Sequence, residues 1–364
     1  MRLPESVLEF AKTDEAVKAY ERFVDFYNES QNKVGKFDTS IPFWKKKEKL
    51  GFAIREEIAR MSNVSKETID SIPTEVLVAN PMYQWACFAV VSSMVDAVLP
   101  ESIIESIGMY TDLKTGRFGS SFSWDIDSRD LFVVSKYGNG KRHAELHKQY
   151  KGQVSITPEN RMISVNTSLY KVLSDVENLA DFARKAVVSL EAEMTRDAYS
   201  VFNTAMEALD NSGDDALRVT GYTQDALVDL CEKVTMYNGG RKAVIVGTQL
   251  ALQNVLPADA GYRYDLQSEY VKLGYIKAAF GYDVMALPQV AAVGADFTKA
   301  LDDNNIYILS PAGDKLIKGA LEGSTTSHIE RAQDTADLTE IITMNKRWGF
   351  AVATSSVAGL IELS

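Results

Sequence analysis

Two of the three histidines in the chain, His143 and His147, lie four positions apart with Glu145 between them. A zinc-protease motif places its glutamate directly after the first histidine and lies on a helix. Here the order is His-Ala-Glu-Leu-His, in a polar segment that we expect to be a strand, where residues four apart are separated by ~13 Å. That separation is too large for one shared metal ion. We therefore expect no metal site, and a cytosolic metal-dependent hydrolase is kept only as an alternative.

Other candidate catalytic patterns are incomplete. Residues 138–142 have the sequence Gly-Asn-Gly-Lys-Arg, but a phosphate-binding loop needs an earlier glycine and a Ser or Thr where Arg142 stands. The chain has no GxSxG sequence that would supply a serine nucleophile for His328. The acidic pair Asp125 and Asp127 has ordinary surface spacing. These patterns predict a protein that is not an enzyme and that binds no cofactor.

The bulk composition excludes several classes of protein. The net charge of -11 argues against a protein that grips nucleic acid, although not against a container that encloses DNA. Cys87 and Cys231 are far apart in apolar contexts, which favours buried thiols in a reducing compartment. Residues 1–15 are too charged for a signal peptide. Residues 82–99 barely reach the ~20 residues that span a bilayer, so they predict a buried helix and no membrane contact.

The first hundred residues have helical periodicity. Apolar side chains recur at steps of three and four in residues 14–34, and Pro42 opens a second amphipathic segment. The four lysines in 45–49 are diluted by nearby glutamates, which favours a solvated face over a nucleic-acid contact.

Residues 119–165 change to alternation and predict a long β-hairpin with its turn at Gly138-Asn139-Gly140. Each arm has on the order of 20 residues and could reach about 60 Å. A hairpin alone is marginal in water, and this one has few bulky side chains. We therefore expect it to lie on another surface.

A long helix follows, opened by a capping box at Ser174 to Glu177 and ended by Asn211-Ser212-Gly213. At ~1.5 Å per residue it should be roughly 55 Å long. Its predicted inner stripe is Leu179, Phe182, Ala186, Leu190, Met194, Ala198, Val201, Ala205 and Leu209.

The remainder predicts an α/β region and a terminal pair of strands. The first pattern is a helix, a strand and a second helix, at 224–237, 242–247 and 248–256. Further strands are expected at 282–287, 305–309 and 316–321. The last two, 338–345 and 350–363, are expected to bend around Arg347-Trp348-Gly349.

In this order of elements, the chain resembles the major capsid proteins of tailed bacteriophages, with the Hong Kong 97-type fold, over roughly residues 100–364. The phrases that carry the resemblance are 176–206 for the long helix, 242–256 for the α/β lobe, 274–288, and the tail 306–362 with Tyr307-Ile308-Leu309 and Gly313-Asp314-Lys315. The implied fold class is α+β. It has an N-terminal arm, an extended hairpin loop, a peripheral domain around a spine helix, and an axial α/β domain.

The resemblance implies a division of the chain into six parts. These are an N-terminal arm and helices (1–80), a first part of the peripheral domain (81–113), the extended loop (114–165), the spine helix (166–219), the axial domain (220–330) and C-terminal peripheral strands (331–364). Because the hairpin begins near 119 and the helices before it can pack, we expect no attached, cleaved scaffold.

The resemblance also implies a role. Such subunits form hexamers and pentamers of an icosahedral shell that encloses double-stranded DNA without sequence-specific binding. The expected partners are further copies of the chain, a portal and a separate scaffolding protein. The expected location is the virion capsid, assembled in the host cytoplasm. An encapsulin-like nanocompartment shell, told apart by protein cargo, and a baseplate or sheath protein are alternatives.

Charge patterning suggests where copies of the chain meet. Residues 114–161 hold nine Lys or Arg and five Asp or Glu, a net of +4, whereas residues 175–230 hold four and twelve, a net of -8. A basic hairpin and an acidic spine favour docking between subunits. The predicted contact residues are Lys136, Lys141, Arg142, Lys148 and Lys151 on the hairpin and Glu177, Asp181 and Glu191 on the spine.

Some relatives join a loop lysine to an asparagine of a neighbour. Candidates here are Lys136, Lys141, Lys148 and Lys151 against Asn345. Both residue types are common and nothing singles out a pair, so we expect no covalent lattice.

Overall fold

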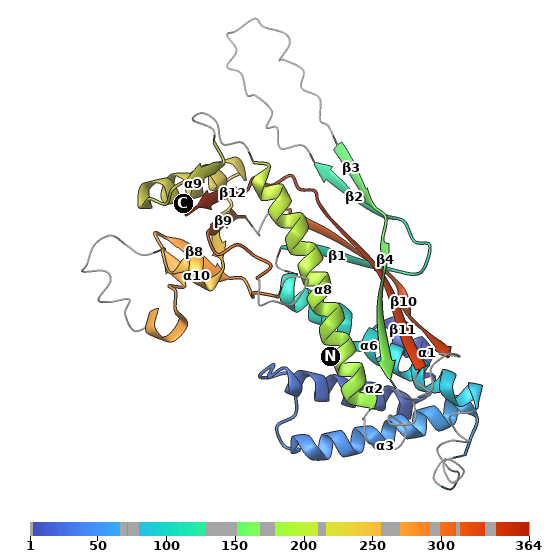
Figure 1. Ribbon diagram of the computed structural model, residues 1–364. Helices are drawn as coiled ribbons and strands as arrows, with labels where there is room; N and C mark the ends of the chain where they lie inside the picture. The colour runs from blue at the N-terminus through green and yellow to red at the C-terminus, as the bar shows by residue number, and fades with distance from the viewer. Residues whose placement is uncertain are drawn as a thin grey trace, which may run out of the picture.

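The computed structural model has an elongated shape in which a long helix runs from a helical base to a second lobe (Figure 1). The structure describes residues 3–65, 71, 80–108, 110–127, 151–167, 179–209, 216–255, 270–291, 299–310, 314–331 and 340–363.

The helical base consists of α1 (Glu5–Ala11), α2 (Asp14–Ser30), α3 (Phe43–Ser62) and α6 (Pro81–Ile107). The last three are close to the predicted segments. Thr13 caps α2 by accepting a 3.3 Å hydrogen bond from the amide of Ala16. Within the described chain, α6 alone has the length and apolar character of a membrane-spanning helix, and 78% of that apolar window is buried. It is the central helix of this base, as predicted from its composition.

The spine helix α8 spans Leu179–Glu207, which at ~1.5 Å per residue is about 43 Å. The predicted capping box at 174–177 lies outside the described residues. The buried stripe of α8 follows the predicted phase from Ala186 through Ala198 and then differs. Phe202 and Met206 are buried in place of Val201 and Ala205. The reason is a change of partner: Phe202 packs on Tyr307 of the second lobe, with ring centroids 4.7 Å apart.

A four-stranded sheet lies behind the spine helix (Figure 1). Its order is β1 (Thr111–Gly116), β10 (Ile317–Arg331), β11 (Glu340–Val352) and β4 (Glu159–Thr167), with β1 parallel to β10 and the other pairs antiparallel. Its inward side chains reach both long helices. The ammonium of Lys346 contacts Asp96 of α6, and the indole N–H of Trp348 donates a 2.9 Å hydrogen bond to Asp197 of α8.

The predicted bend at Arg347-Trp348-Gly349 is wrong. Strand β11 runs unbroken through these residues, and Trp348 pairs in register with Leu321 and Glu159. Trp348 is 1% exposed, so burial of the indole and its bond to Asp197 hold this segment extended.

The second lobe is built on a six-stranded sheet. Its order is β5 (Arg218–Thr220), β12 (Gly359–Glu362), β9 (Asn305–Leu309), β6 (Val244–Gly247), β8 (Tyr282–Ala286) and β7 (Ala278–Ala279). Val246 and Tyr307 face the main core, whereas Ile245 and Ile308 belong to a second core with α9 (Gln224–Tyr237) and α10 (Gln249–Leu252). Successive side chains along each central strand therefore pack on opposite faces of the sheet, into two separate apolar layers.

The division into six domains stays a proposal. Strand pairing favours placing β10, which was expected in the axial part, with the four-stranded sheet. It likewise favours placing β12, which was expected in the peripheral part, with the six-stranded sheet.

Candidate interaction surface

A small two-stranded sheet projects from the body of the protein (Figure 1). It pairs β2 (Phe122–Asp127) with β3 (Lys151–Ile156) in antiparallel register, and we call these two strands the hairpin root. The predicted arms continued to residue 165, but after Ile156 the chain leaves the hairpin and β4 joins β11 instead. Alternation predicted that both segments are strands, but it could not show which strand each one pairs with.

The hairpin root has apolar contacts with its own subunit. Phe122, Trp124 and Ile156 are buried together against Ala320 of β10. The sequence predicted that the hairpin has too few bulky side chains for a core of its own and lies on another surface, and at its base that surface is β10 of the same subunit. At its base, the hairpin belongs to the subunit's fold.

Two glycines allow the hairpin root to approach the large sheet. A Cβ added at Gly116 would lie 2.9 Å from the ring of Phe122, and one at Gly349 would lie 2.9 Å from Cγ2 of Ile156. Both distances are shorter than ordinary carbon–carbon contacts. Any larger residue at either position would push the root away from β1 or β11.

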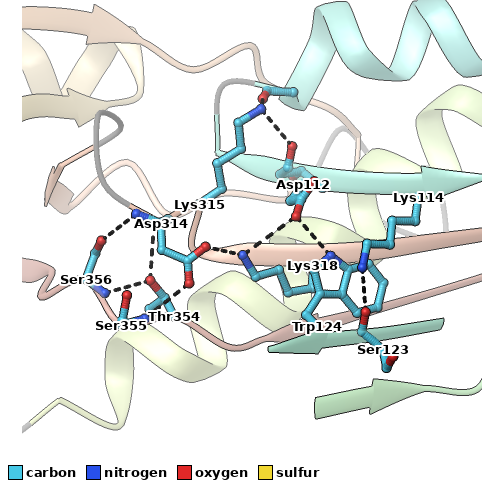
Figure 2. A network of polar contacts seen from close by, with 12 residues as sticks. Asp112, Lys114, Ser123, Trp124, Asp314, Lys315, Lys318, Thr354, Ser355 and Ser356 are labelled. Atoms are coloured by element: carbon cyan, nitrogen blue, oxygen red, sulfur yellow. Dashed lines mark hydrogen bonds and ion pairs between the residues drawn. The ribbon is translucent and has the colours of Figure 1, made fainter. Parts of the chain in front are cut away.

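Polar contacts fix the root on β1, as Figure 2 shows. The indole N–H of Trp124 donates to Oδ2 of Asp112 at 2.9 Å. The ammonium of Lys114 lies 4.6 Å from the centre of the Trp124 ring and donates to the carbonyl of Ser123. The indole of Trp124 is therefore held both by the cation of Lys114 at its face and by a charge-assisted hydrogen bond from its N–H to Asp112.

The four-stranded sheet has a second face, opposite α6 and α8, which we call the outer sheet face. Side chains alternate along a strand, so Asn345 and Arg347 point to it while Lys346 and Trp348 point inward. In register with them on β4 are Met162, which is 64% exposed, and Asn160. This face includes a hollow lined by Phe118, Asn160, Glu322, Gly323, Ser324, Thr326, Asn345, Lys346 and Arg347.

A turn carrying Phe118 borders this hollow. Glu322, only 4% exposed, accepts a 2.7 Å hydrogen bond from the amide of Gly119 and pairs with Arg347 at 2.9 Å. The guanidinium of Arg347 lies 5.2 Å from the centre of the Phe118 ring, and Phe118 is 78% exposed. The buried carboxylate therefore holds an exposed aromatic side chain in a defined position.

One buried acceptor on this face is unused. Oδ1 of Asn345 has no hydrogen-bond partner among the described residues, although it is shielded from solvent. An amide oxygen left without a partner costs free energy.

The predicted contact residues lie as follows. Lys151 is exposed at the start of β3, whereas Lys136, Lys141, Arg142, Lys148 and Glu177 fall outside the described residues. On the spine, Oδ2 of Asp181 accepts from Lys47 at 2.6 Å, and Glu191 accepts from the hydroxyl of Tyr27 at 2.7 Å. Both of these acids thus have partners within their own subunit, and a role between subunits stays a prediction for all eight residues.

Metal chemistry has no support in the described part of the chain, where no group of three or more His, Cys, Asp or Glu could hold an ion. His143, Glu145 and His147 lie outside it, so the expected absence of a metal is not tested. His328 is exposed on β10, and Asp125 is exposed on β2.

No protein-family model matches the chain, and no curated protein does. Among solved structures, the chain matches the capsid of a native GTA particle with a TM-score of 0.51 and 14% sequence identity, over 72% of this chain and 90% of that one. The chain has the fold of a capsid protein. This confirms the predicted α+β capsid fold at the level of its overall class.

The chain also matches two phage capsids, at lower TM-scores. The mature capsid of bacteriophage PhiM1 gives a TM-score of 0.47 at 11% identity, over 70% of this chain and 85% of that one. The capsid of Cyanophage P-SCSP1u gives 0.46 at 15% identity, over 70% and 86%.

Several residues of the surface were not identified from the sequence. Phe118, Glu322 and Asp112 belong to segments with no motif, and their contacts join residues that are far apart in the chain. One signal was available for Phe118, because a bulky aromatic between Gly116 and Gly119 is unusual for a strand and typical of a presented turn.

Proposed function

We propose that the chain is a major capsid protein whose copies form hexamers and pentamers of an icosahedral shell, enclosing double-stranded DNA without sequence-specific binding. The observation that carries this proposal is the hairpin root. It projects from the body of a subunit with a capsid fold and is anchored by Trp124 to β1. A firmly anchored arm that leaves its own body is suited to contact a neighbour.

The outer sheet face is the best acceptor for a neighbour's arm. It is polar, and its exposed Phe118 and Met162 offer apolar area. Asp181 and Glu191 of the spine are already bonded within the subunit. The proposal therefore moves the main contact from the spine helix to this sheet, with the basic arm and acidic spine adding long-range attraction.

The proposed partners are further copies of the chain, a portal and a separate scaffolding protein. The proposed location is the virion capsid after assembly in the host cytoplasm, and the proposed role is structural, without catalysis. An encapsulin-like shell would differ in its contents, since it would co-purify with protein cargo where a phage shell would hold DNA.

A shortened hairpin tests this function. Replacing residues 128–150 by a short Gly/Ser turn keeps β2, β3 and β4, so the subunit should stay folded, because changing a loop length costs well under ~1 kcal/mol per doubling. It should form no shells. Circular dichroism and a cooperative melt would check the fold, and light scattering with electron microscopy would check assembly.

A wider replacement, 128–161, is the contrast variant. It also removes β3, including the buried Ile156, and the first residues of β4, including Arg161, which pairs with Asp197. We expect it to lower the melting temperature as well. Shells formed by the 128–150 variant would show that the arm is not needed for assembly and would overturn the proposal.

A further inference from the structure

Three crossings of the chain meet beside β1. The chain passes from α6 into β1 at Gly108 to Thr111, from β9 into β10 next to Asp314, and from β11 into β12 at Thr354 to Ser356. The last two crossings connect the four-stranded and six-stranded sheets, and Figure 2 shows their side chains converging.

Asp314 fastens the two crossings between the sheets to each other. Its amide donates to Oγ of Ser356 at 2.9 Å, its carbonyl accepts from the hydroxyl of Thr354 at 3.1 Å, and its carboxylate accepts from the amide of Ser355 at 3.3 Å. The neighbouring Lys315 donates to the carbonyls of Gly108 and Thr111 and so includes the third crossing.

Lys318 extends this set of contacts to the hairpin root. Its side chain is 2% exposed, and its ammonium pairs with Asp314 and lies 3.9 Å from Oδ2 of Asp112. The same oxygen of Asp112 accepts the indole N–H of Trp124. A continuous series of contacts thus runs from Ser356, between the two sheets, to the base of the arm.

We infer that Lys318 is a positioning residue that couples the direction of the hairpin to the crossings between the two sheets. A buried ammonium held between two carboxylates has a defined position, because leaving either charge unpaired is unfavourable. A two-stranded hairpin has little stability of its own, so its direction depends on its contacts with β1 and β10, and Lys318 adds a charged contact to the apolar ones. For assembly, which rests on the proposed function, a loosened anchor admits several angles between neighbouring subunits and hence several shell curvatures.

Hydrogen exchange on the unassembled subunit tests the coupling without requiring shells. Lys318→Met keeps the apolar stem and removes the charge, and Trp124→Phe keeps an aromatic ring but removes the N–H donor together with part of the buried indole. We expect amides of β2 and β3 to exchange on the order of ten to a hundred times faster in both variants, as for one lost hydrogen bond to a charged group. The matched control is Lys299→Met, which breaks another lysine–aspartate pair at the same i,i+4 spacing, with Asp303, and should leave β2 and β3 unchanged.

The amides of Ser355 and Ser356 give the second readout, and Lys318→Met should raise their exchange together with that of the hairpin. Unchanged exchange in β2 and β3 would overturn the coupling. If Lys318→Met does not fold, the test rests on Trp124→Phe, which acts at the other end of the series. A change confined to position 124 and its direct neighbours in that variant, with Ser355 unaffected, would also overturn it.

Particle diameters test the consequence for assembly. Shells of Lys318→Met should have a broader distribution of diameters than wild-type shells. Equal distributions would overturn the link to curvature. An absence of particles from the wild-type chain would contradict the proposed function instead, and the exchange result would still decide the coupling.

Discussion

The ammonium of Lys346 lies 2.8 Å from a carboxylate oxygen of Asp96, although 250 positions separate the two residues in the chain. Both are nearly fully buried, and Asp96 also accepts two hydrogen bonds from Thr325, from its amide at 2.8 Å and its hydroxyl at 2.6 Å. The contact ties α6 to the irregular segment of β10 between Glu322 and Thr326. The helical base and the large sheet are thereby joined through one buried charge pair.

Removing one charge of this pair should destabilise the subunit strongly. Asp96→Ala leaves Lys346 buried without its partner, so we expect the free energy of unfolding to fall by about 3 kcal/mol. Asp229→Ala is the control, because it breaks an exposed pair with Lys233 and should cost less than ~1 kcal/mol. Urea unfolding measures both, and equal costs would contradict the assigned role of Asp96.

Tyr27 should contribute to the loss of stability at alkaline pH. Burial raises the pKa of its hydroxyl, and the hydrogen bond to Glu191 raises it further. An unfolded tyrosine loses its proton near pH ~10, whereas folded Tyr27 keeps it to higher pH. Its contribution is therefore complete below pH ~10 and is lost as the pH rises above that value.

In Tyr27→Phe, the fall of unfolding free energy above pH ~10 should be less steep, by up to ~1.4 kcal/mol per pH unit for one group. Other buried tyrosines keep part of the slope. Chemical unfolding at a series of pH values measures it, and an identical slope in both proteins would rule out this role of Tyr27.

Assembly should weaken as salt rises. The basic hairpin segment and the acidic spine segment attract through exposed charges, and such contacts are screened beyond ~8 Å at physiological ionic strength. Light scattering of assembling subunits from low to molar salt measures the effect. Equal assembly across that range would mean that apolar burial alone drives docking.

We expect no covalent lattice between subunits. Asn345 lies on the outer sheet face with its amide oxygen shielded from solvent, and nothing in the described chain selects a lysine to react with it. A denaturing gel of mature particles should show a single monomer band. Ladders of high-mass bands would show that the prediction is wrong.

Local patterns predicted the elements with strong periodicity or clear end signals. Helix α9 begins and ends where the pattern of 224–237 placed it, and β9 occupies the predicted residues 305–309. The inner stripe of α8 was correct at Ala186 and Leu190, because a helix that packs on one surface keeps its phase. In these segments the local preference and the tertiary contacts agree.

Pairing between distant strands was beyond reach of the sequence. Ser164 of β4 and Thr343 of β11 pair across a separation of 179 positions, and alternation carries no information about a partner that far away. The segment around Trp348 was misassigned as a bend because Gly349 favours turns. There, burial of the indole outweighs the local preference. The outer sheet face depends on these pairings, so it could not be foreseen.

Electron microscopy of the purified full chain tests the central claim most directly. Negative-stain images at assembly concentration should show closed, roughly spherical shells of uniform diameter, with capsomers that have five and six subunits in averaged views. Only monomers, tubes or flat discs across a range of protein concentrations and salt would contradict the proposal that this capsid fold builds a shell.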